Sequence, residues 1–231
     1  MKNLAIIPAR GGSKRIPRKN IKDFLGKPII AYSIEAAAKS GLFDEIMVST
    51  DDQEISQVAK EYGAKVPFMR SNRTSDDYAI FSEVIDEVKE EYSKKQIVFD
   101  YICCILPTAP LMALENFKKG YKVLVNTNVD SVRPVVQFVY PIQRAVKMKN
   151  GKIEMFNPEH KKTRSQDLEP AYYDAGQFYW MKYKTGLKGD NNFGFEISST
   201  QAQDIDTDDD WVLAEIKYAF MTQKRGEHEK I

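Results

Sequence analysis

The feature that most constrains the fold of this 231-residue chain is a repeated alternation of short apolar runs with amphipathic stretches. Residues 4–7 form the first apolar run, and apolar residues at helical spacing follow from Pro28 to a stop at Gly41. The same reading predicts strands at 46–49, 66–69, 101–106, 131–136 and 177–181 and helices at 53–62, 76–92, 114–124 and 208–224. Continuous apolar strands separated by helices predict an α/β fold with three layers and a mostly parallel sheet.

The pattern changes between about residues 137 and 170, where short stretches alternate with turn signals. Asn150-Gly151 and Asn157-Pro158 flank candidate strands at 145–148 and 153–156, which predicts a small antiparallel insertion. Its apolar residues either build a core of their own or form an interface. With no internal repeat and no low-complexity linker, we expect a single domain spanning residues 1–231.

A cationic glycine loop directly follows the first predicted strand, in the sequence IIPARGGSKRIPRKN at residues 6–20. In an open parallel sheet such a loop lies at the carboxyl ends of the strands, where ligands bind. Gly11 and Gly12 allow a backbone to approach a ligand, and Ser13 adds a hydroxyl. Six cations fall within thirteen residues: Arg10, Lys14, Arg15, Arg18, Lys19 and Lys22.

This composition favours a site for a polyphosphate anion. The alternative is a glycine turn with a solvated cationic face. A Walker loop is excluded because Arg15, not Ser or Thr, follows Lys14, and a dinucleotide fingerprint is excluded because the glycines are adjacent.

Several other classes of protein are disfavoured by composition. The net charge is only +1, so we expect no nucleic-acid partner. No apolar stretch is long enough to span a bilayer or to serve as a signal peptide, so we expect no membrane association and a cytoplasmic location. The two cysteines, Cys103 and Cys104, are adjacent and read as buried thiols in a strand. Two histidines in all make a histidine metal cluster or a Ser-His-Asp triad improbable.

A run of carboxylates near the C-terminus offers a second site. In an extended segment Asp204 and Asp206 project to one side while Ile205 faces the core, and such a pair suits Mg²⁺. Alternatively, these acids belong with the acids at 208–210, which favour the start of the last helix. We interpret Thr207 or Asp208 as its cap.

A further pair, Asp51 and Asp52, ends the second predicted strand. These residues either contribute to metal or ribose binding or cap the next helix, and we favour the cap.

The loop also carries a resemblance to a known family. IPARGGSKRIPRKNIK, followed by GKP at 26–28, resembles the signature of the cytidylyltransferases that make CMP-activated nonulosonic acids. Further segments fit in the expected order: VSTDD at 48–52, YGAKVPFMR ending at Arg70, SDDY at 75–78, PTAP at 107–110 and DIDT at 204–207. The resemblance covers nearly the whole chain.

This resemblance implies a Rossmann-like sheet of the nucleotide-diphospho-sugar transferase type. It also implies transfer of CMP from CTP to a nine-carbon sugar acid with Mg²⁺ as cofactor, and a homodimer formed through the insertion at about 137–170. The segments CC before TAP and YDAGQFYW at 173–180 are similar to the branch that uses pseudaminic acid, for glycosylation of flagellin or surface polysaccharide. Residues that sialic acid enzymes use as polar partners are replaced by Leu106, Tyr173 and Ala175. Legionaminic acid, N-acetylneuraminic acid and a non-catalytic nucleotide-binding module remain as alternatives.

The family's functional residues carry over to matching positions of this chain. The expected catalytic residues are Arg10, Lys14, Lys19 and Asp206. The expected CTP-binding residues are Ala9, Arg10, Gly11, Gly12, Ser13, Lys14, Lys19 and Arg70, with Arg70 and the backbone near Ala9 reading cytosine. The expected sugar-binding residues are Asn20, Leu106, Arg164, Tyr173 and Gln177, and the expected metal ligands are Asp204 and Asp206. Where the family commonly has hydroxyl residues after SDDY, this chain has Ala79, Ile80 and Phe81, which bears on selectivity for CTP over UTP.

Overall fold

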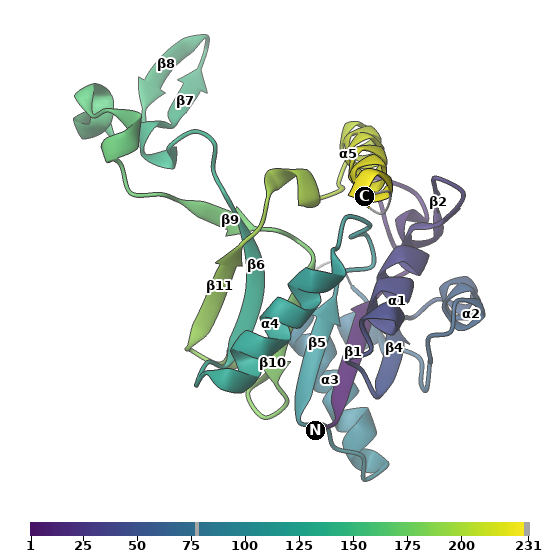
Figure 1. Cartoon of the computed structure of the whole chain (residues 1–231). Helices are drawn as coiled ribbons and strands as arrows, with labels where there is room; N and C mark the ends of the chain where they lie inside the picture. The colour runs from purple at the N-terminus through teal and green to yellow at the C-terminus, as the bar shows by residue number, and fades with distance from the viewer. Residues whose placement is uncertain (77–78, 229–231) are drawn as a thin grey trace.

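A computed structural model describes the backbone of residues 1–76 and 79–228, with side chains through residue 223 (Figure 1). Asp77 and Tyr78 of the SDDY segment therefore lie outside the described residues. One large mixed sheet forms the centre of the molecule. Its strands are β1 (Asn3–Pro8), β4 (Glu45–Ser49), β5 (Tyr101–Ile105), β6 (Ser131–Gln137), β9 (Tyr172–Asp174), β10 (Phe178–Lys182) and β11 (Asn192–Glu196).

The sheet is mostly parallel, as predicted. Its order is β11-β6-β10-β5-β1-β4, and β9 pairs with β6 off this path. β1 pairs in parallel with β4 and β5, and β11 pairs in parallel with β6. β10 is antiparallel to both of its neighbours, and β9 is antiparallel to β6. The carboxyl ends of β1, β4 and β5 therefore meet along one edge of the sheet.

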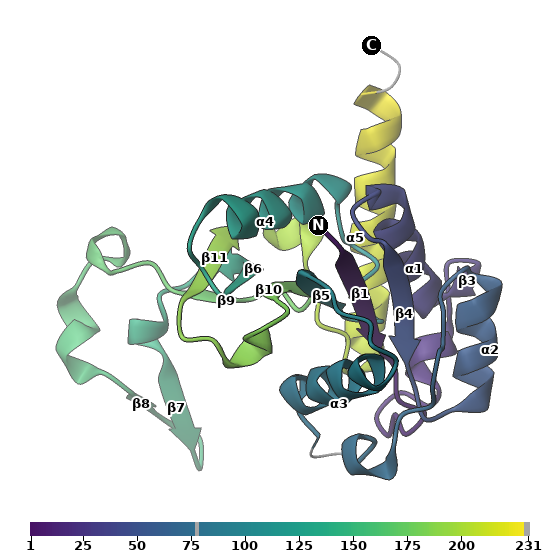
Figure 2. The same ribbon diagram turned by 90° about the horizontal axis from the view of Figure 1, so that it is seen from below.

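Helices cover both faces of the sheet (Figure 2). They are α1 (Ile29–Ser40), α2 (Gln53–Glu61), α3 (Phe81–Lys94), α4 (Leu114–Asn126) and α5 (Asp208–His228). α1, α2 and α4 contribute to the larger buried cluster on one face, and α3 contributes to a second cluster on the other. The predicted arrangement of three layers is confirmed.

Burial along β1 shows why the strand reads as a continuous apolar run. Ala5 and Ile7 belong to the larger cluster while Leu4 and Ile6 belong to the second, because successive side chains point to opposite faces. The side chains of Cys103 and Cys104 also point to opposite faces of the sheet, and both are buried free thiols. Burial raises the pKa of Cys104 to about 12, so the prediction of inert core cysteines is confirmed.

A third cluster fastens α5 over the carboxyl edge of the sheet. Trp211 and Ala214 of α5 pack with Phe24 and Tyr32, and the rings of Phe24 and Trp211 lie 5.5 Å apart by centroid. Phe24 belongs to a small hairpin, β2 (Asp23–Phe24) with β3 (Lys27–Pro28), that follows the cationic loop. The last helix is thereby held beside a loop almost two hundred residues earlier in the chain.

Two predictions of secondary structure were wrong, and two strands of the central sheet were not predicted. No strand forms at 66–69. The pairing with β4 is limited to an isolated bridge between Met47 and Lys65, because Pro67 has no N–H with which to continue the ladder. The helix predicted from residue 76 begins at Phe81. β9 and β11 were not predicted, since β9 has three residues and β11 is mostly exposed.

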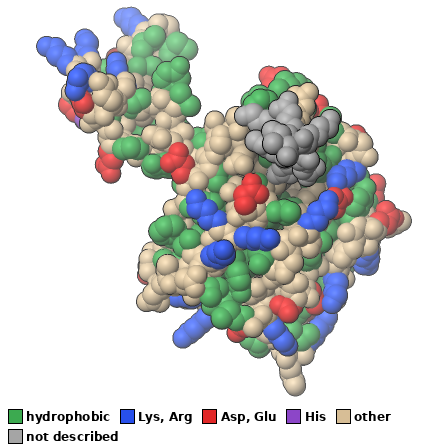
Figure 3. All heavy atoms as spheres, in the orientation of Figure 1, with side chains coloured by type: hydrophobic (Ala, Val, Ile, Leu, Met, Phe, Trp, Pro, Cys, Tyr) green, Lys and Arg blue, Asp and Glu red, His purple; other side chains and the backbone are tan. Residues whose placement is uncertain are grey.

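The insertion is an arm that projects from the sheet between β6 and β9 (Figure 1). It carries an antiparallel hairpin, β7 (Val146–Lys149) with β8 (Lys152–Met155), as the turn signals predicted. The possibility that the arm has a core of its own is contradicted, because Val146, Met148 and Ile153 are all more than half exposed. Hydrophobic side chains and those of Lys and Arg gather on its surface (Figure 3).

No helix in the described part of the chain is both long and apolar enough to cross a membrane.

Candidate active site

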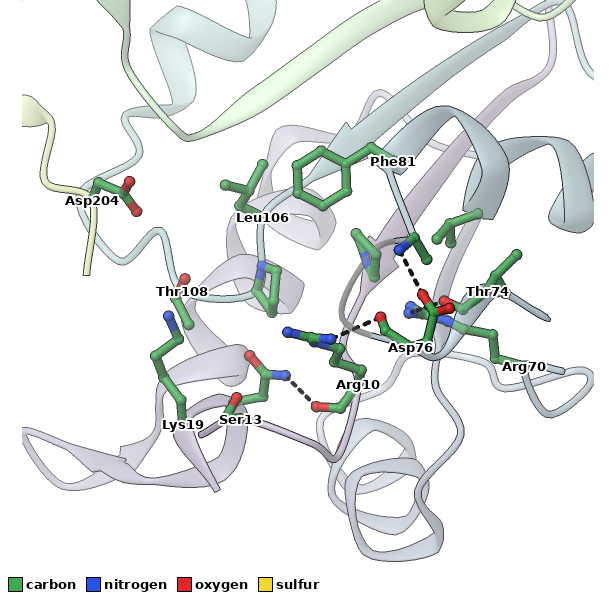
Figure 4. A pocket seen from close by; sticks show the side chains of 15 residues that line it. Arg10, Ser13, Lys19, Arg70, Thr74, Asp76, Phe81, Leu106, Thr108 and Asp204 are labelled. Atoms are coloured by element: carbon green, nitrogen blue, oxygen red, sulfur yellow. Dashed lines mark hydrogen bonds between the residues drawn. The ribbon is translucent and has the colours of Figure 1, made fainter. Parts of the chain in front are cut away.

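A cavity of about 300 Å³ opens at the carboxyl ends of β1 and β5 (Figure 4). Its lining comes from the cationic loop, from the segments that follow β4 and β5, from the start of α3 and from the segment before α5. The lining residues are Pro8, Arg10, Ser13, Lys19, Asn20, Arg70, Thr74, Asp76, Ala79, Phe81, Val84, Leu106, Pro107, Thr108 and Asp204. The structure thus brings together residues from almost every segment that the sequence singled out.

The glycine loop is held against the two acids that follow β4. The amide of Gly11 donates to Asp51 Oδ1 at 3.0 Å. A Cβ atom on Gly11 would lie 2.6 Å from Asp52 Oδ2, whereas one on Gly12 would meet nothing within 4 Å. Glycine at position 11 is therefore required by the close approach to Asp52.

Arg18 holds the far end of the same loop to Asp52 and to Glu54. Its guanidinium contacts both oxygens of Asp52, with Nη2 at 2.9 Å from Oδ1, and it also pairs with Glu54. Arg18 adopts a left-handed backbone conformation with φ of 54°, which disfavours a residue with a side chain. These contacts offset that cost. Arg18 is a structural cation of the loop.

Asp52 also caps α2, as predicted, by accepting a hydrogen bond from the amide of Ile55 at 3.0 Å. The hydrogen bond from Arg18 lowers the pKa of the Asp52 carboxyl from 3.8 to about 2, and the amide of Ile55 adds to this effect. The carboxylate is therefore ionised in the folded protein at neutral pH.

Three residues of the loop, Arg10, Asn20 and Lys19, are directed to the cavity. Arg10 Nη1 donates to the carbonyl of Asp76 at 2.8 Å, and the side chain of Asn20, which is buried, donates to the carbonyl of Arg10 at 2.9 Å. Lys19 Nζ donates to the carbonyl of Ile205 at 2.6 Å and lies 3.5 Å from a carboxylate oxygen of Asp206. Lys19 therefore joins the two candidate sites that the sequence placed 187 residues apart.

The remaining cations of the loop lie elsewhere. Lys14 is exposed on the loop. Arg15 pairs with Asp206 at 2.7 Å, a contact that the sequence did not reveal. Lys22 pairs with Asp208 at 3.4 Å and lies over the ring of Trp211. The cations of the loop therefore fall into three groups. Some line the cavity, some pair with acids in or next to the carboxylate segment, and Arg18 holds the loop in place.

Arg70 lies in the wall of the cavity and is only 8% exposed. Its Nε donates to the hydroxyl of Ser49 at 3.0 Å, and its other nitrogens donate to the carbonyls of Ser49 and Thr74. Burial lowers its pKa. The amide of Ala9 likewise donates to the carbonyl of Ser49, so both groups expected to read cytosine are engaged with the wall.

The carboxylate pair has the predicted arrangement around Ile205, which is fully buried. Asp204 is exposed at the cavity, and Asp206 is about one third exposed. Partial desolvation raises the pKa of Asp204, and the neighbouring charge of Asp206 raises it further. Two carboxylates that repel one another favour a divalent cation between them.

Mg²⁺ commonly takes only one or two carboxylates from a protein and completes its shell with water and substrate phosphates. The described residues contain no group of three His, Cys, Asp or Glu side chains arranged to hold a metal. The donor set at Asp204 and Asp206 therefore fits a Mg²⁺ ion that arrives with a polyphosphate.

A second hollow of about 360 Å³ adjoins the first and shares Asp204 with it. Its other lining residues are Tyr173, Asp174, Ala175, Ala202, Gln203, Asp206, Asp210 and Lys217. Tyr173 and Ala175 are two of the three positions, with Leu106, at which we expect this chain to differ from the sialic acid enzymes. The carboxylate pair thus lies between a cationic cavity and a hollow that contains both of these positions.

The other residues that we expect to bind the sugar lie in different parts of the molecule. Leu106 lines the first cavity, and its amide donates to the carbonyl of Gln177 at 2.8 Å. The side chain of Gln177 is buried and donates to the carbonyl of Gln201, so it supports the wall. Arg164 lies on the arm, 70% exposed and paired with Asp167 at 2.7 Å. Within one copy of the chain it is not brought to either hollow.

Sequence reasoning missed several lining residues. Asp76 and Thr108 lie in the SDDY and PTAP segments, which were recognised without a role for these side chains. Phe81, by contrast, was expected to bear on selectivity for the base, and it lines the cavity from the start of α3. Lys217 lies on α5, and no pattern in the sequence distinguishes it from the other lysines of that helix.

Several known proteins are similar to this chain over most of its length. A sequence profile for a family described as cytidylyltransferase matches residues 4–209. A pseudaminic acid cytidylyltransferase from Campylobacter jejuni is 46% identical over 94% of this chain and 97% of its own. A CMP-N,N'-diacetyllegionaminic acid synthase from Legionella pneumophila is 31% identical over 93% and 95%.

Among solved structures, a CMP:2-keto-3-deoxy-manno-octonic acid synthetase complexed with CTP superposes with a TM-score of 0.70. It is 19% identical and covers 97% of this chain and 100% of its own. At that identity the likeness shows the fold alone, and it confirms the nucleotidyltransferase type expected from the sequence.

Proposed function

This chain belongs to the cytidylyltransferase family, and from that premise we propose that it transfers CMP from CTP to the anomeric hydroxyl of pseudaminic acid. The observation that carries the proposal is the meeting of a cationic glycine loop with a distant carboxylate pair at one crevice, through Lys19. The name of the Campylobacter relative supplies the sugar. The residues at positions 173 and 175 support it, since both line the second hollow.

In the reaction the sugar oxygen forms a bond to the α-phosphorus of CTP, and the bond from that phosphorus to the β-phosphate bridge breaks. Pyrophosphate leaves and the hydroxyl proton is lost. Rate acceleration in such transfers comes mainly from positioning and from stabilisation of charge. We assign the triphosphate to the first cavity, where Arg10, Ser13 and Lys19 would bind its oxygens, with Lys14 and the amide of Gly12 at the loop surface.

Asp204 and Asp206 would hold Mg²⁺, which when bound neutralises phosphate charge and favours ionisation of the attacking hydroxyl. Lys19 keeps the carboxylate segment beside the phosphate loop by donating to the carbonyl of Ile205. Asn20 orients Arg10 by donating to its carbonyl. The base is assigned to the pocket wall near Arg70, Ala79 and Phe81, where shape and backbone groups rather than the guanidinium would select cytosine.

We also propose a homodimer formed through the arm. This is supported by the exposed apolar side chains of Val139, Tyr140, Met148 and Phe156, because soluble chains rarely leave so many on one projection. In such a dimer Arg164 would approach the second hollow of the other copy. A sedimentation measurement that gave a monomer at micromolar concentration would contradict this.

The product would be the activated donor for glycosylation of flagellin or of a surface polysaccharide, and we place the reaction in the cytoplasm, where CTP is available.

The test of the proposed function is pyrophosphate release with CTP and Mg²⁺ and with pseudaminic, legionaminic and N-acetylneuraminic acids in turn. We expect the highest kcat/KM with pseudaminic acid. A higher value with another sugar would reassign the substrate. Tight binding of CTP without pyrophosphate release from any sugar would make the chain a nucleotide-binding module. Replacing CTP with UTP tests the base assignment in the same assay.

A further inference from the structure

The segment that carries the carboxylate pair has no regular structure of its own. Residues 202–206 belong to no helix or strand, so no ladder of backbone hydrogen bonds fixes their direction. Metal ligands work best when their orientation is held by neighbouring groups. Something outside the segment must therefore hold Asp204 and Asp206 in place.

Arg15 and Lys19 contact the Asp206 carboxylate from the glycine loop, and Asp210, in the first turn of α5, holds the backbone of the segment. Its Oδ2 accepts hydrogen bonds from the amide of Asp206 at 3.1 Å and from the amide and hydroxyl of Thr207 at 2.9 and 2.7 Å. Thr207 returns the contact by accepting from the amide of Asp210 at 3.2 Å, so Thr207 caps the helix as predicted. One carboxylate oxygen thus holds two successive backbone amides, one of which belongs to a metal-ligating residue.

The other oxygen of Asp210 is connected through Gln203 to the backbone carbonyl of Asp204. Gln203 Nε2 lies 3.2 Å from Asp210 Oδ1 and donates to the carbonyl of Asp204 at 2.9 Å. Lys217, two turns further along α5, donates to Gln203 Oε1 at 2.9 Å and to the carbonyl of Ala202 at 2.7 Å. The chain of contacts therefore runs from α5 to both sides of the pair.

We propose that Asp210 is a positioning residue, supported by Gln203 and Lys217, that holds the Asp204 and Asp206 carboxylates in the orientation needed to bind a divalent cation. This inference rests on the proposed function, because it assigns the metal to that reaction. α5 is a firm support, since Trp211 and Ala214 anchor it in the third buried cluster. Orientation of the metal ligands is thereby coupled to the packing of the last helix.

The neighbouring acids of the same turn do not share this role. Asp208 points toward Lys22. Asp209 is exposed and makes no hydrogen bond or ion pair with the described residues. The sequence alone does not distinguish the three acids, since each places a favourable negative charge at a helix N-terminus. Asp209→Asn is therefore a matched control, because it removes the same charge from the same turn without touching the carboxylate segment.

The experiment compares Asp210→Asn with Asp209→Asn in the full-length protein. The first readout is amide hydrogen exchange of the metal-free protein, followed by mass spectrometry. We expect the amides of residues 206 and 207 to exchange faster in Asp210→Asn, because asparagine replaces a carboxylate that accepts from both. Asp209→Asn leaves their exchange unchanged.

The second readout is the Mg²⁺ dependence of pyrophosphate release at saturating CTP and sugar. Loss of a partner that orients a metal ligand typically costs about 10-fold to 100-fold in metal affinity. We expect Asp210→Asn to raise the half-saturating Mg²⁺ concentration by at least about 10-fold, with kcat at saturating Mg²⁺ largely retained. Lys217→Met removes the contacts with Gln203 and with the carbonyl of Ala202 but leaves Asp210 in place, so we expect it to raise the half-saturating Mg²⁺ concentration by less.

Equal shifts in the Asp209 and Asp210 variants would overturn the proposal in favour of a general charge effect. Unchanged exchange of the 206 and 207 amides in Asp210→Asn would overturn it as well. If the unaltered protein releases no pyrophosphate with any sugar, the proposed function fails, and the exchange measurement still decides whether Asp210 holds the segment. Thermal unfolding of each variant identifies one that does not fold, in which case Lys217→Met carries the test.

Discussion

Replacing Asp52 with Asn removes one ion pair that holds the glycine loop, the pair with Arg18. The contact with the Arg18 guanidinium is lost, and the loop is freed at the end opposite Gly11. Asparagine caps helices about as well as aspartate, so the start of α2 is retained. The difference in stability between the parent protein and this variant therefore measures the contribution of the ion pair, because the helix cap is retained in both.

The expected size of the effect follows from the pKa of Asp52. A lowering from 3.8 to about 2 corresponds to about 2.5 kcal/mol of stabilisation. The side chain of Asp52 is 22% exposed and that of Arg18 is 37% exposed, so solvent screening reduces the value. We expect the free energy of unfolding to fall by about 1 kcal/mol, which for a chain of this size lowers the Tm by about 2–4 °C.

The difference between the two proteins also depends on pH. The carboxylate has a lower pKa in the folded state than in the unfolded state, so its stabilisation is fully present above about pH 4. It is lost as the pH falls from about 4 toward 2, where Asp52 becomes protonated in the folded protein. The unfolding free energies of the parent protein and Asp52→Asn should therefore converge over that range.

The assay is urea unfolding of the parent protein, Asp52→Asn, Arg18→Met and the double variant, together with the KM for CTP. We expect a coupling energy of about 1 kcal/mol between the two positions and a KM for CTP raised about 5-fold if the same energy is lost from phosphate binding. Additive effects of the two substitutions, or a stability loss that does not change between pH 7 and 3, would refute the reasoning.

Three further predictions concern the site itself. Lys19→Met should lower kcat/KM for pyrophosphate release by about 100-fold or more, whereas Lys22→Met, whose amine points away from the cavity, should change it by less than about 3-fold. Gly11→Ala should raise the KM for CTP, measured from initial rates at varied CTP. The Cβ of the alanine would lie 2.6 Å from Asp52 Oδ2 and would displace the loop. Ala175→Asn should reduce kcat/KM for pseudaminic acid by about 10-fold, because a larger polar group at this buried position narrows the second hollow and typically costs 1–3 kcal/mol.

Much of the fold could be predicted because its signals are local. The buried strands at 4–7 and 101–106 read as continuous apolar runs, and α1 ends at a glycine in the left-handed conformation at Gly41. β11 could not be predicted, since four of its five residues are exposed and only its pairing with β6 makes it a strand. The antiparallel direction of β10 could not be predicted either, because a buried strand has the same composition whichever way it runs.

The candidate site shows the same division. The glycine loop, its cations and the alternation of Asp204 with Asp206 are visible in the sequence, because backbone freedom, charge and a two-residue period are local properties. Which cation serves which purpose is not local. Arg18 and Lys19 are adjacent, yet one pairs with the acid that caps α2 and the other with the segment before α5.

The sequence by itself therefore determined the class of fold and the family, and it singled out the two short segments for which we propose phosphate binding and metal binding. Only the tertiary structure decided that these segments meet, that Asp204 lies between two hollows, and that Asp210 differs from its neighbour Asp209. The physical reason is that a side chain's role depends on the partners that packing brings to it. In this chain the paired residues Arg15 and Asp206 are almost two hundred positions apart.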